Sequence, residues 1–258
     1  MRSPHFQVFE HLNTIFRQQD NTRDRQLSIR TYKILPLTPQ TGVIEWVNNT
    51  IPFGSYLVSS SRQVKHAGAH ERYYPNDLTN QQCREKLKDA QAKGKEYEIF
   101  VEICDKFHPA FRFFFLEKFS DPSMWMASRL AFTRSVATSS IVGWALGVGD
   151  RHSQNILIDS TNGQVVQIDF GIVFEQGKHL GIPETVPFRL TRDIVDGFGV
   201  NGCEGTFRKC SEQVLGVLRA KMNQLLTILE VVIHDPLYKW SISPIEATKR
   251  QRKRNLGK

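Results

Sequence analysis

The sequence predicts an α+β protein in which a small strand-bearing N-terminal part precedes a larger, mostly helical lobe. Two short β-like segments occur within the first 50 residues, whereas helical periodicity dominates after about residue 54. A second pair of short apolar segments, at 155–159 and 165–169, interrupts the helical region. With 258 residues, of which 40% are hydrophobic, the chain is long enough for one domain or one two-lobed unit with a real core.

The N-terminal part begins with a predicted amphipathic helix over residues 6–16, where apolar side chains recur at helical spacing. Two strands are predicted next, over 27–37 and 43–47. The intervening Thr-Pro-Gln-Thr-Gly segment is typical of a turn, so the two strands are expected to form a hairpin.

Several helices are predicted in the larger lobe. One spans 96–107 and ends before Pro109, with four apolar residues on one face: Phe100, Ile103, Cys104 and Phe107. The phenylalanine-rich segment 111–115 is expected to lie in the core of a helix. A long helix begins at Asp121-Pro122, where aspartate can cap the first turn and proline suits it, and runs to Gly147. Further helices are predicted over 204–234.

The net charge of +8 is concentrated at the C-terminal end. Six of the 34 basic residues lie in the last ten positions, which leaves 28 basic against 26 acidic residues before them. A nucleic-acid-binding module needs basic residues spread over a folded face, so this distribution argues against one. The basic end is interpreted as either a solvated tail or a nuclear-localisation patch.

Composition also bears on the compartment. No apolar segment reaches the roughly 18 residues needed to span a bilayer, and no secretory signal follows the initial Met-Arg. The four cysteines have no C-x-x-C spacing, which argues against a disulfide framework or a zinc ribbon. We therefore expect a reducing, intracellular compartment.

The segment that carries chemistry is 147–155, Gly-Val-Gly-Asp-Arg-His-Ser-Gln-Asn, followed fourteen positions later by Asp169-Phe170-Gly171. Phosphoryl transfer from ATP needs a carboxylate that meets the substrate hydroxyl and oxygen ligands that hold Mg²⁺. Asp150 and Asn155 supply the first carboxylate and an amide oxygen, and the second predicted strand returns to place Asp169 beside Asn155. Asp-Phe-Gly alone is common by chance, but the joint pattern of loop, spacing, hairpin and second acid favours phosphoryl transfer.

The five-residue separation of Asp150 and Asn155 matches the catalytic Asp and metal-binding Asn of protein kinases, although there the His comes first. The order Asp-Arg-His-x-x-Asn resembles the phosphatidylinositol-kinase superfamily. Within it, the strings at 133–140 and 184–196 resemble the phosphatidylinositol 3-kinase-related protein kinases, specifically their ATM-like members. The likeness runs from about residue 6 to residue 245.

This resemblance implies a protein-kinase-like fold with a partial N-lobe, consisting of a helix and a β-hairpin, and a complete, mostly helical C-lobe. The implied boundaries are 1–47 for the N-lobe remnant ending at the hinge, 48–245 for the C-lobe, and 246–258 for a basic tail. The implied cofactors are ATP and Mg²⁺, with Mn²⁺ as a possible substitute.

The resemblance also assigns roles to residues. Asp150 would orient the substrate hydroxyl and accept its proton, and His152 would donate to the transferring phosphoryl group. Asn155 and Asp169 would bind the metal. The remaining residues would form the nucleotide pocket: backbone groups of Glu45 and Val47 would bond adenine, Trp46 would cover it, and Leu157 and Ile168 would form its apolar floor and back.

The charge of the segment after Gly171 bears on which kind of molecule accepts the phosphoryl group. A lipid kinase must hold an anionic head group, and its activation loop tends to be basic. Between Gly171 and Thr191 this chain balances Lys178 and Arg189 against Glu175 and Glu184, which favours a protein Ser or Thr. For ATM-like kinases the resemblance implies Ser or Thr followed by Gln, a role in DNA-damage and double-strand-break signalling, and a location in the nucleus, with the cytoplasm as a further possibility.

The sequence also departs from the family. The family places a glycine-rich loop, a phosphate-binding Lys and its acidic partner upstream of the first hairpin, and a short C-terminal domain after the C-lobe; none is present here. We therefore expect a fragment that is inactive or severely impaired alone, whose partners would include the missing N-lobe, the upstream helical region and the C-terminal domain. Two alternatives stay open: a catalytically incompetent pseudokinase or scaffold, and a lipid kinase of the same superfamily.

Overall fold

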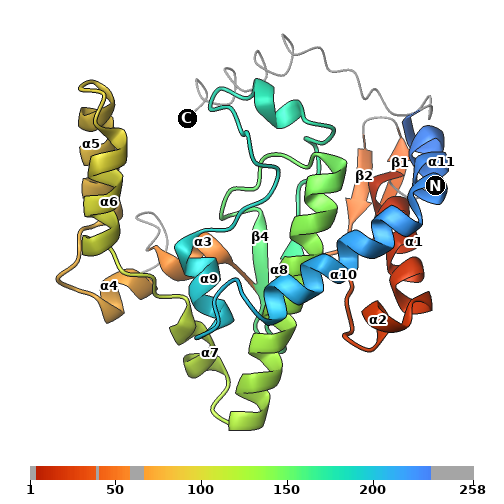
Figure 1. The fold of residues 1–258 in the computed structure, drawn as a ribbon, viewed down its shortest axis with the longest axis horizontal. Helices are drawn as coiled ribbons and strands as arrows, with labels where there is room; N and C mark the ends of the chain where they lie inside the picture. Colours follow the sequence, from red (N-terminus) through yellow and green to blue (C-terminus); the bar gives the residue numbers. More distant parts are fainter. Residues whose placement is uncertain (1–3, 39–40, 59–66, 234–258) are drawn as a thin grey trace.

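The computed structural model describes residues 4–38, 41–58 and 67–233, and it confirms the mixed α+β class (Figure 1). The helices are α1 (Pro4–Gln18), α2 (Asp20–Arg23), α3 (Phe53–Leu57), α4 (Ala69–Tyr73), α5 (Asn80–Gln91), α6 (Glu96–Lys106), α7 (Arg112–Lys118), α8 (Pro122–Leu146), α9 (Arg192–Phe198), α10 (Thr206–Ala220) and α11 (Met222–Ile233), with a 3₁₀ turn, η1 (Gln176–His179). The strands are β1 (Ile34–Thr38), β2 (Thr41–Ile44), β3 (Thr50–Pro52), β4 (Ile156–Asp159) and β5 (Val165–Gln167). The basic tail at 246–258 lies outside the described residues.

The predicted N-terminal hairpin is present, but its strands are shorter and displaced. β1 and β2 pair antiparallel, with Ile34 opposite Ile44 and Leu35 opposite Val43. The first strand begins at Ile34 instead of at the predicted residue 27, and the second ends at Ile44 instead of at residue 47.

Residues 27–33 are extended, and their bonding explains the shorter first strand. The side chain of Asn13 on α1 accepts a hydrogen bond from the Ile29 amide and donates one to the Ile29 carbonyl, each at 2.8 Å. This carboxamide therefore takes the place that a neighbouring strand would occupy, and Leu27 and Ile29 pack into the core beneath α1.

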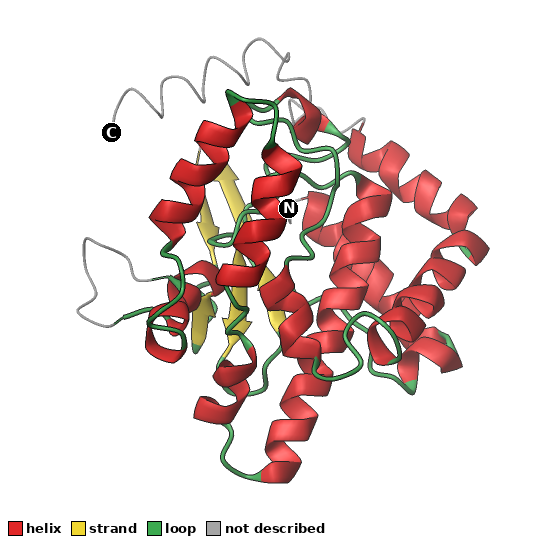
Figure 2. Ribbon diagram, turned by 60° about the vertical axis from the view of Figure 1, so that its left-hand side comes forward, coloured by secondary structure: helices red, strands yellow, loops and turns green. Residues whose placement is uncertain are grey.

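A three-stranded antiparallel sheet has the order β3-β4-β5. The β4–β5 hairpin matches the pair predicted at 155–159 and 165–169, and its turn contains Gly163 in the left-handed region at φ 77°. The short strand β3 was not predicted; it pairs Ile51 with Ile158 and ends at Pro52, which is tolerated because β3 is an edge strand. Figure 2 shows how small the strand content is beside the helices.

The long helix α8 begins and ends as its sequence predicts. The Asp121 carboxylate accepts a hydrogen bond from the Met124 amide at 2.9 Å, Pro122 occupies the first turn, and Gly147 closes the helix in the left-handed conformation at φ 58°. Because α8 contributes to two apolar cores, it is buried on more than one face.

The two cores have different compositions. The first is rich in phenylalanine, and its fully buried rings include Phe111, Phe114, Phe115 and Phe132, which confirms that 111–115 is a core segment. The second packs α1 against α8, α10 and α11. α10 and α11 together correspond to the helices predicted over 204–234.

The apolar face predicted for the helix at 96–107 is partly wrong. α6 forms at that place, but only Ile103 of the four predicted residues is buried, and Phe100 is 51% exposed. The reason is that α6 packs against α5, and this helical pair projects from the body at the left of Figure 1. The start of α5 is fixed by a capping box between Thr79 and Gln82. α5 covers only part of the surface of α6, so Phe100 is exposed, whereas Cys104 and Phe107 are half-buried. None of the helices in the described ranges combines the length and apolar character needed to cross a bilayer.

The Asn13 contact generates a stability prediction. Asn13→Ala leaves the amide and carbonyl of Ile29 without their side-chain partner in a buried place, so we expect the free energy of unfolding to fall by about 2–4 kcal/mol. Urea denaturation followed by circular dichroism measures this. Thr14→Ala, one position along on the exposed side of α1, is the matched control and should change stability by less than about 0.5 kcal/mol. Equal effects of the two substitutions would contradict the role given to Asn13.

Candidate active site

The loop 147–155 leaves the end of α8 and packs closely against the segment that follows Gly171. The Gly149 amide donates to the Ile172 carbonyl at 2.9 Å, and the Glu175 amide donates to the Gly147 carbonyl at 3.0 Å. A side chain at either glycine has no room: a Cβ on Gly147 would lie 2.5 Å from the Glu175 nitrogen, and one on Gly149 would lie 2.9 Å from the Gly177 Cα. The glycines are therefore required by the close approach of two backbone segments.

Asp150 is held in this loop through its backbone. Its φ of 58° is in the left-handed region, a conformation that costs a non-glycine residue on the order of 1 kcal/mol. Its amide donates to a carboxylate oxygen of Glu184 at 2.6 Å, and its carbonyl accepts from the Asn155 side-chain amide at 3.0 Å. The exposed His152 lies nearby, with Nε2 at 4.0 Å from Asp150 Oδ1.

Asn155 and Asp169 meet as the predicted strand pairing requires. The Ile168 amide donates to the Asn155 carbonyl at 3.0 Å, and Ile156 is opposite Gln167 in the β4–β5 ladder. Asn155 immediately precedes β4 and Asp169 follows β5, so they lie at the same end of the hairpin. The Asn155 side-chain nitrogen donates to the Asp150 carbonyl, so the side-chain oxygen is the atom of Asn155 that could ligate a cation.

Arg151 is the buried centre of the loop. It is only 4% exposed, and its guanidinium donates to the carbonyl oxygens of Gly149 (2.9 Å), Ile168 (2.9 Å) and Asp169. Burial lowers the pKa of Arg151, and the charges of nearby carboxylates, including that of Glu184, oppose this shift. Sequence reasoning gave Arg151 no role, because only the three-dimensional path of 168–169 reveals its partners.

Tyr32 is a second residue that sequence reasoning missed. Burial raises its pKa to about 12; a hydrogen bond to the backbone of Asp169 and the charge of Arg151 act in the opposite direction. The N-terminal part thus reaches the metal-ligand candidate directly. No signal in the sequence marks Tyr32, since a tyrosine between Thr31 and Lys33 is unremarkable in an extended segment.

The predicted hinge residues lie between β2 and β3. The Glu45 amide donates to the Lys33 carbonyl at 2.8 Å, and the Val47 carbonyl accepts from the Thr50 hydroxyl at 2.8 Å. Trp46 is 83% exposed, so it is not an ordinary core residue.

The two predicted apolar pocket residues are both half-buried. Leu157 is opposite Pro52 of β3 and Val166 of β5, so the central strand β4 carries it. Ile168 directly follows β5 and lies opposite Asn155, next to the Ile156–Gln167 end of the ladder.

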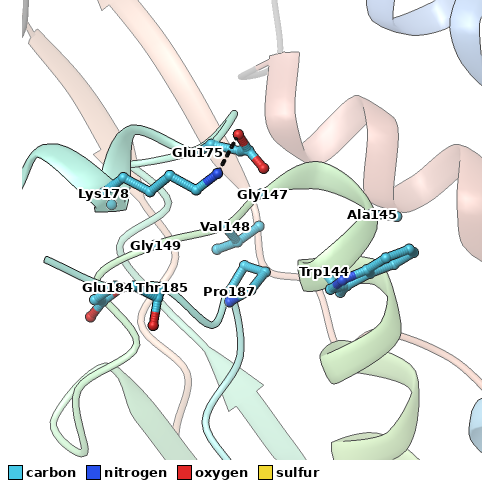
Figure 3. Close-up of a pocket in the computed structure, with 11 residues that line it drawn as sticks. Trp144, Ala145, Gly147, Val148, Gly149, Glu175, Lys178, Glu184, Thr185 and Pro187 are labelled. Atoms are coloured by element: carbon cyan, nitrogen blue, oxygen red, sulfur yellow. Dashed lines mark hydrogen bonds and ion pairs between the residues drawn. The ribbon is translucent and has the colours of Figure 1, made fainter.

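A pocket of about 360 Å³ lies between the end of α8, the start of the loop at 147–149 and the segment 175–187 (Figure 3). Glu184 lines it while bonding the Asp150 amide, and Lys178 pairs with Glu175 at 2.8 Å. The pocket therefore joins the catalytic-loop candidate to the loop that follows Gly171.

The charge and donor types of the site suit a divalent cation. The carboxylates of Asp150, Asp169 and Glu184 interact electrostatically with the buried Arg151, and Arg189 also interacts with Glu184. Among these five groups the carboxylates outnumber the cations by one. Carboxylate and amide oxygens are the ligands that Mg²⁺ takes, and it commonly uses one or two protein ligands and completes its shell with phosphate and water. In keeping with this, the described residues contain no group of three His, Cys, Asp or Glu side chains that could enclose a metal alone.

Comparison of the sequence with known proteins identifies its family. The sequence matches the family described as phosphatidylinositol 3- and 4-kinase over residues 2–242, which is most of the chain. The chain belongs to this kinase family.

Within this family, the chain is similar to proteins that are named as protein kinases. It is 52% identical over 243 residues to Serine-protein kinase ATM of Sus scrofa, covering 93% of this chain and 8% of that protein. It is 52% identical over 246 residues to Serine/threonine-protein kinase ATM of Arabidopsis thaliana, covering 95% and 6%. The chain therefore spans less than a tenth of the length of these relatives.

Solved structures agree with the kinase-like fold. The structure described as the FAT and kinase domain of CtTel1 superposes with a TM-score of 0.86 at 45% identity, covering 97% of this chain and 17% of that one. The Tel1 kinase butterfly symmetric dimer superposes with a TM-score of 0.80 at 38% identity, covering 99% and 11%. The predicted fold class is confirmed.

The close approach at Gly149 in this kinase-family loop generates a prediction. Gly149→Ala would place a methyl group 2.8 Å from Ile172 Cγ2 and 2.9 Å from Gly177 Cα, and the second atom is backbone, so the segments must move apart. We expect the free energy of unfolding to fall by about 1–3 kcal/mol. Gly216→Ala, in the middle of α10 with no atom within 4 Å of the new methyl group, is the control and should raise stability by about 0.5–1 kcal/mol. If Gly149→Ala left the free energy of unfolding unchanged, the packing of Gly149 against Ile172 and Gly177 would be shown to be loose.

Proposed function

We propose that the chain is the catalytic region of a serine/threonine protein kinase that transfers a phosphoryl group from Mg-ATP to protein hydroxyls. The observation that carries the proposal is the meeting of Asn155 and Asp169 at one end of the β4–β5 hairpin, next to Asp150. The names of the relatives support the same reaction.

The catalytic roles follow from position. Asp150, held by Glu184 and Asn155 through its backbone, keeps its half-buried carboxylate to orient the acceptor hydroxyl and take its proton. His152 is exposed beside it and donates to the transferring phosphoryl group, where negative charge develops.

Asn155 and Asp169 would hold the metal, which neutralises the phosphate charge when bound. We propose Mg²⁺ as the physiological ion, with Mn²⁺ as a substitute. The carboxylates of Asp150, Asp169 and Glu184 outnumber Arg151 and Arg189, and this supports a divalent ion, because such an ion offsets the repulsion between the carboxylates.

The nucleotide base would lie against the hinge at 45–47, where the proposed N-lobe part (1–47) meets the C-lobe (48–245). Because the Glu45 amide and the Val47 carbonyl are bonded within the chain, the Glu45 carbonyl and the Val47 amide are the groups that would bond adenine. The exposed indole of Trp46 is accessible to cover the base, and Leu157 of β4 and Ile168, directly after β5, would form its apolar floor and back.

Protein is the proposed acceptor, with Gln after the phosphorylated Ser or Thr. The balanced charge of 171–191 argues against a lipid head group. A role in DNA-damage signalling and a nuclear location are proposed from the relatives named ATM.

Phosphate transfer to a Ser-Gln peptide, measured with labelled ATP and Mg²⁺, tests the proposal. Asp169→Ala should lower the transfer rate by at least about 100-fold, because the metal is lost from the transition state. Asp89→Ala, on the exposed face of α5, is the matched control and should leave the rate unchanged. Even a slow rate suffices, since the ratio between variants is what is tested.

Calorimetry of Mg-ATP binding separates the alternatives. A folded chain with neither ATP affinity nor transfer would favour a scaffold over a kinase. Transfer to phosphatidylinositol vesicles in preference to the peptide would favour a lipid kinase. Transfer equally good to Ser-Ala and Ser-Gln peptides would refute the proposed preference for Gln alone.

A further inference from the structure

Arg151 lies between the two residues proposed to act on the substrate, yet none of the proposed catalytic steps uses it. We propose that Arg151 is a positioning residue that fixes the backbone on both sides of Asp169 and thereby orients its carboxylate for a divalent cation. This inference rests on the proposed metal-binding role of Asp169.

The bonding pattern carries the argument. Nη1 donates to the Ile168 carbonyl, which belongs to the peptide plane before the Asp169 Cα, and Nη2 donates to the Asp169 carbonyl, which belongs to the plane after it. The rotations that set φ and ψ of Asp169 turn these two planes relative to each other. One rigid guanidinium that holds both planes therefore fixes both angles.

Fixing them matters because Asp169 has a φ of 57°, in a region that non-glycine residues rarely adopt. The direction of its carboxylate depends directly on this backbone conformation. Arg151 itself is tied to the catalytic loop, since Nε donates to the Gly149 carbonyl at 2.9 Å. The loop that carries Asp150 and the corner that carries Asp169 are thus held in one frame.

The residues around Arg151 hold its guanidinium in place and leave the Asp169 carboxylate accessible. The guanidinium lies 5.1 Å from the centre of the Phe170 ring, which in turn packs against Phe9 of α1 at 4.8 Å. Arg151 is almost completely buried, so water competes little for its bonds. Its hydrogen bonds go to carbonyl oxygens, which leaves the exposed carboxylate of Asp169 for a cation.

Lysine keeps the charge but cannot reproduce the planar fork, so Arg151→Lys is the decisive variant. Binding of Mn²⁺ to the 258-residue chain, measured by electron paramagnetic resonance, should weaken by at least about tenfold. Arg129→Lys is the matched control, because Arg129 also stacks on an aromatic ring (Trp125, 4.3 Å) but lies outside the site. It should bind Mn²⁺ as the unchanged chain does.

The outcomes separate this inference from the proposed function. If the unchanged chain binds no Mn²⁺, or if Asp169→Ala does not weaken binding, the metal role of Asp169 fails and the inference falls with it. If Asp169→Ala abolishes binding while folded Arg151→Lys binds normally, the inference alone is wrong.

Folding is checked by circular dichroism, with Arg151→Gln as a second variant that keeps two N–H donors without the charge. A folded Arg151→Gln should bind Mn²⁺ more weakly than the unchanged chain. If both Arg151 variants are unfolded, Arg151 supports the whole lobe rather than the metal ligand, and the positioning role is refuted.

Discussion

The antiparallel pairing of β4 with β5 is the constraint on which the candidate site depends. Neither Asn155 nor Asp169 lies inside a strand, but the ladder between Ile156 and Gln167 sets the distance between them. The hairpin is itself anchored to α8, because the Val165 amide donates to the buried Ser135 hydroxyl at 2.9 Å. A hairpin that moved relative to α8 would separate Asp169 from the loop 147–155 that follows α8.

α8 therefore places both halves of the site. Its C-terminus delivers the loop with Asp150, and its middle holds the hairpin with Asp169. The turn of the hairpin is seated as tightly, since a Cβ on Gly163 would lie 2.6 Å from the Ser128 carbonyl of the same helix. α8 packs against other elements on several sides, and its apolar residues belong to both cores. Its apolar residues are therefore not confined to one face.

Much of this could be predicted from the sequence because it is encoded locally. The Asp121-Pro122 start of α8, the turn before Val165 and the spacing of Asp150 and Asn155 are all short-range signals, and the structure confirms the elements they predict. The interpretation of these residues as catalytic stays a prediction, since geometry alone shows only that they lie together.

What could not be predicted depends on contacts between distant segments. The first strand is shortened because Asn13 of α1 occupies the bonding groups of Ile29, and no local pattern reports that contact. Phe100 is exposed because, among the described elements, α6 packs chiefly against α5, which is a fact of tertiary arrangement. Arg151 and Tyr32 converge on the backbone of Asp169 from segments more than 100 residues apart in the chain.

The electrostatics of the site also depend on contacts between distant segments. Asp150, Asp169 and Glu184 are not paired with one another; Glu184 accepts the Asp150 amide, and the buried charge of Arg151 lies among all three. The negative charges are thus partly offset by Arg151 and, at Glu184, by Arg189 before any metal is bound. Glu184 belongs to the loop after Gly171, so a displacement of Glu184 would break its hydrogen bond to the Asp150 amide. The geometry of the loop 147–155 therefore depends on the position of Glu184.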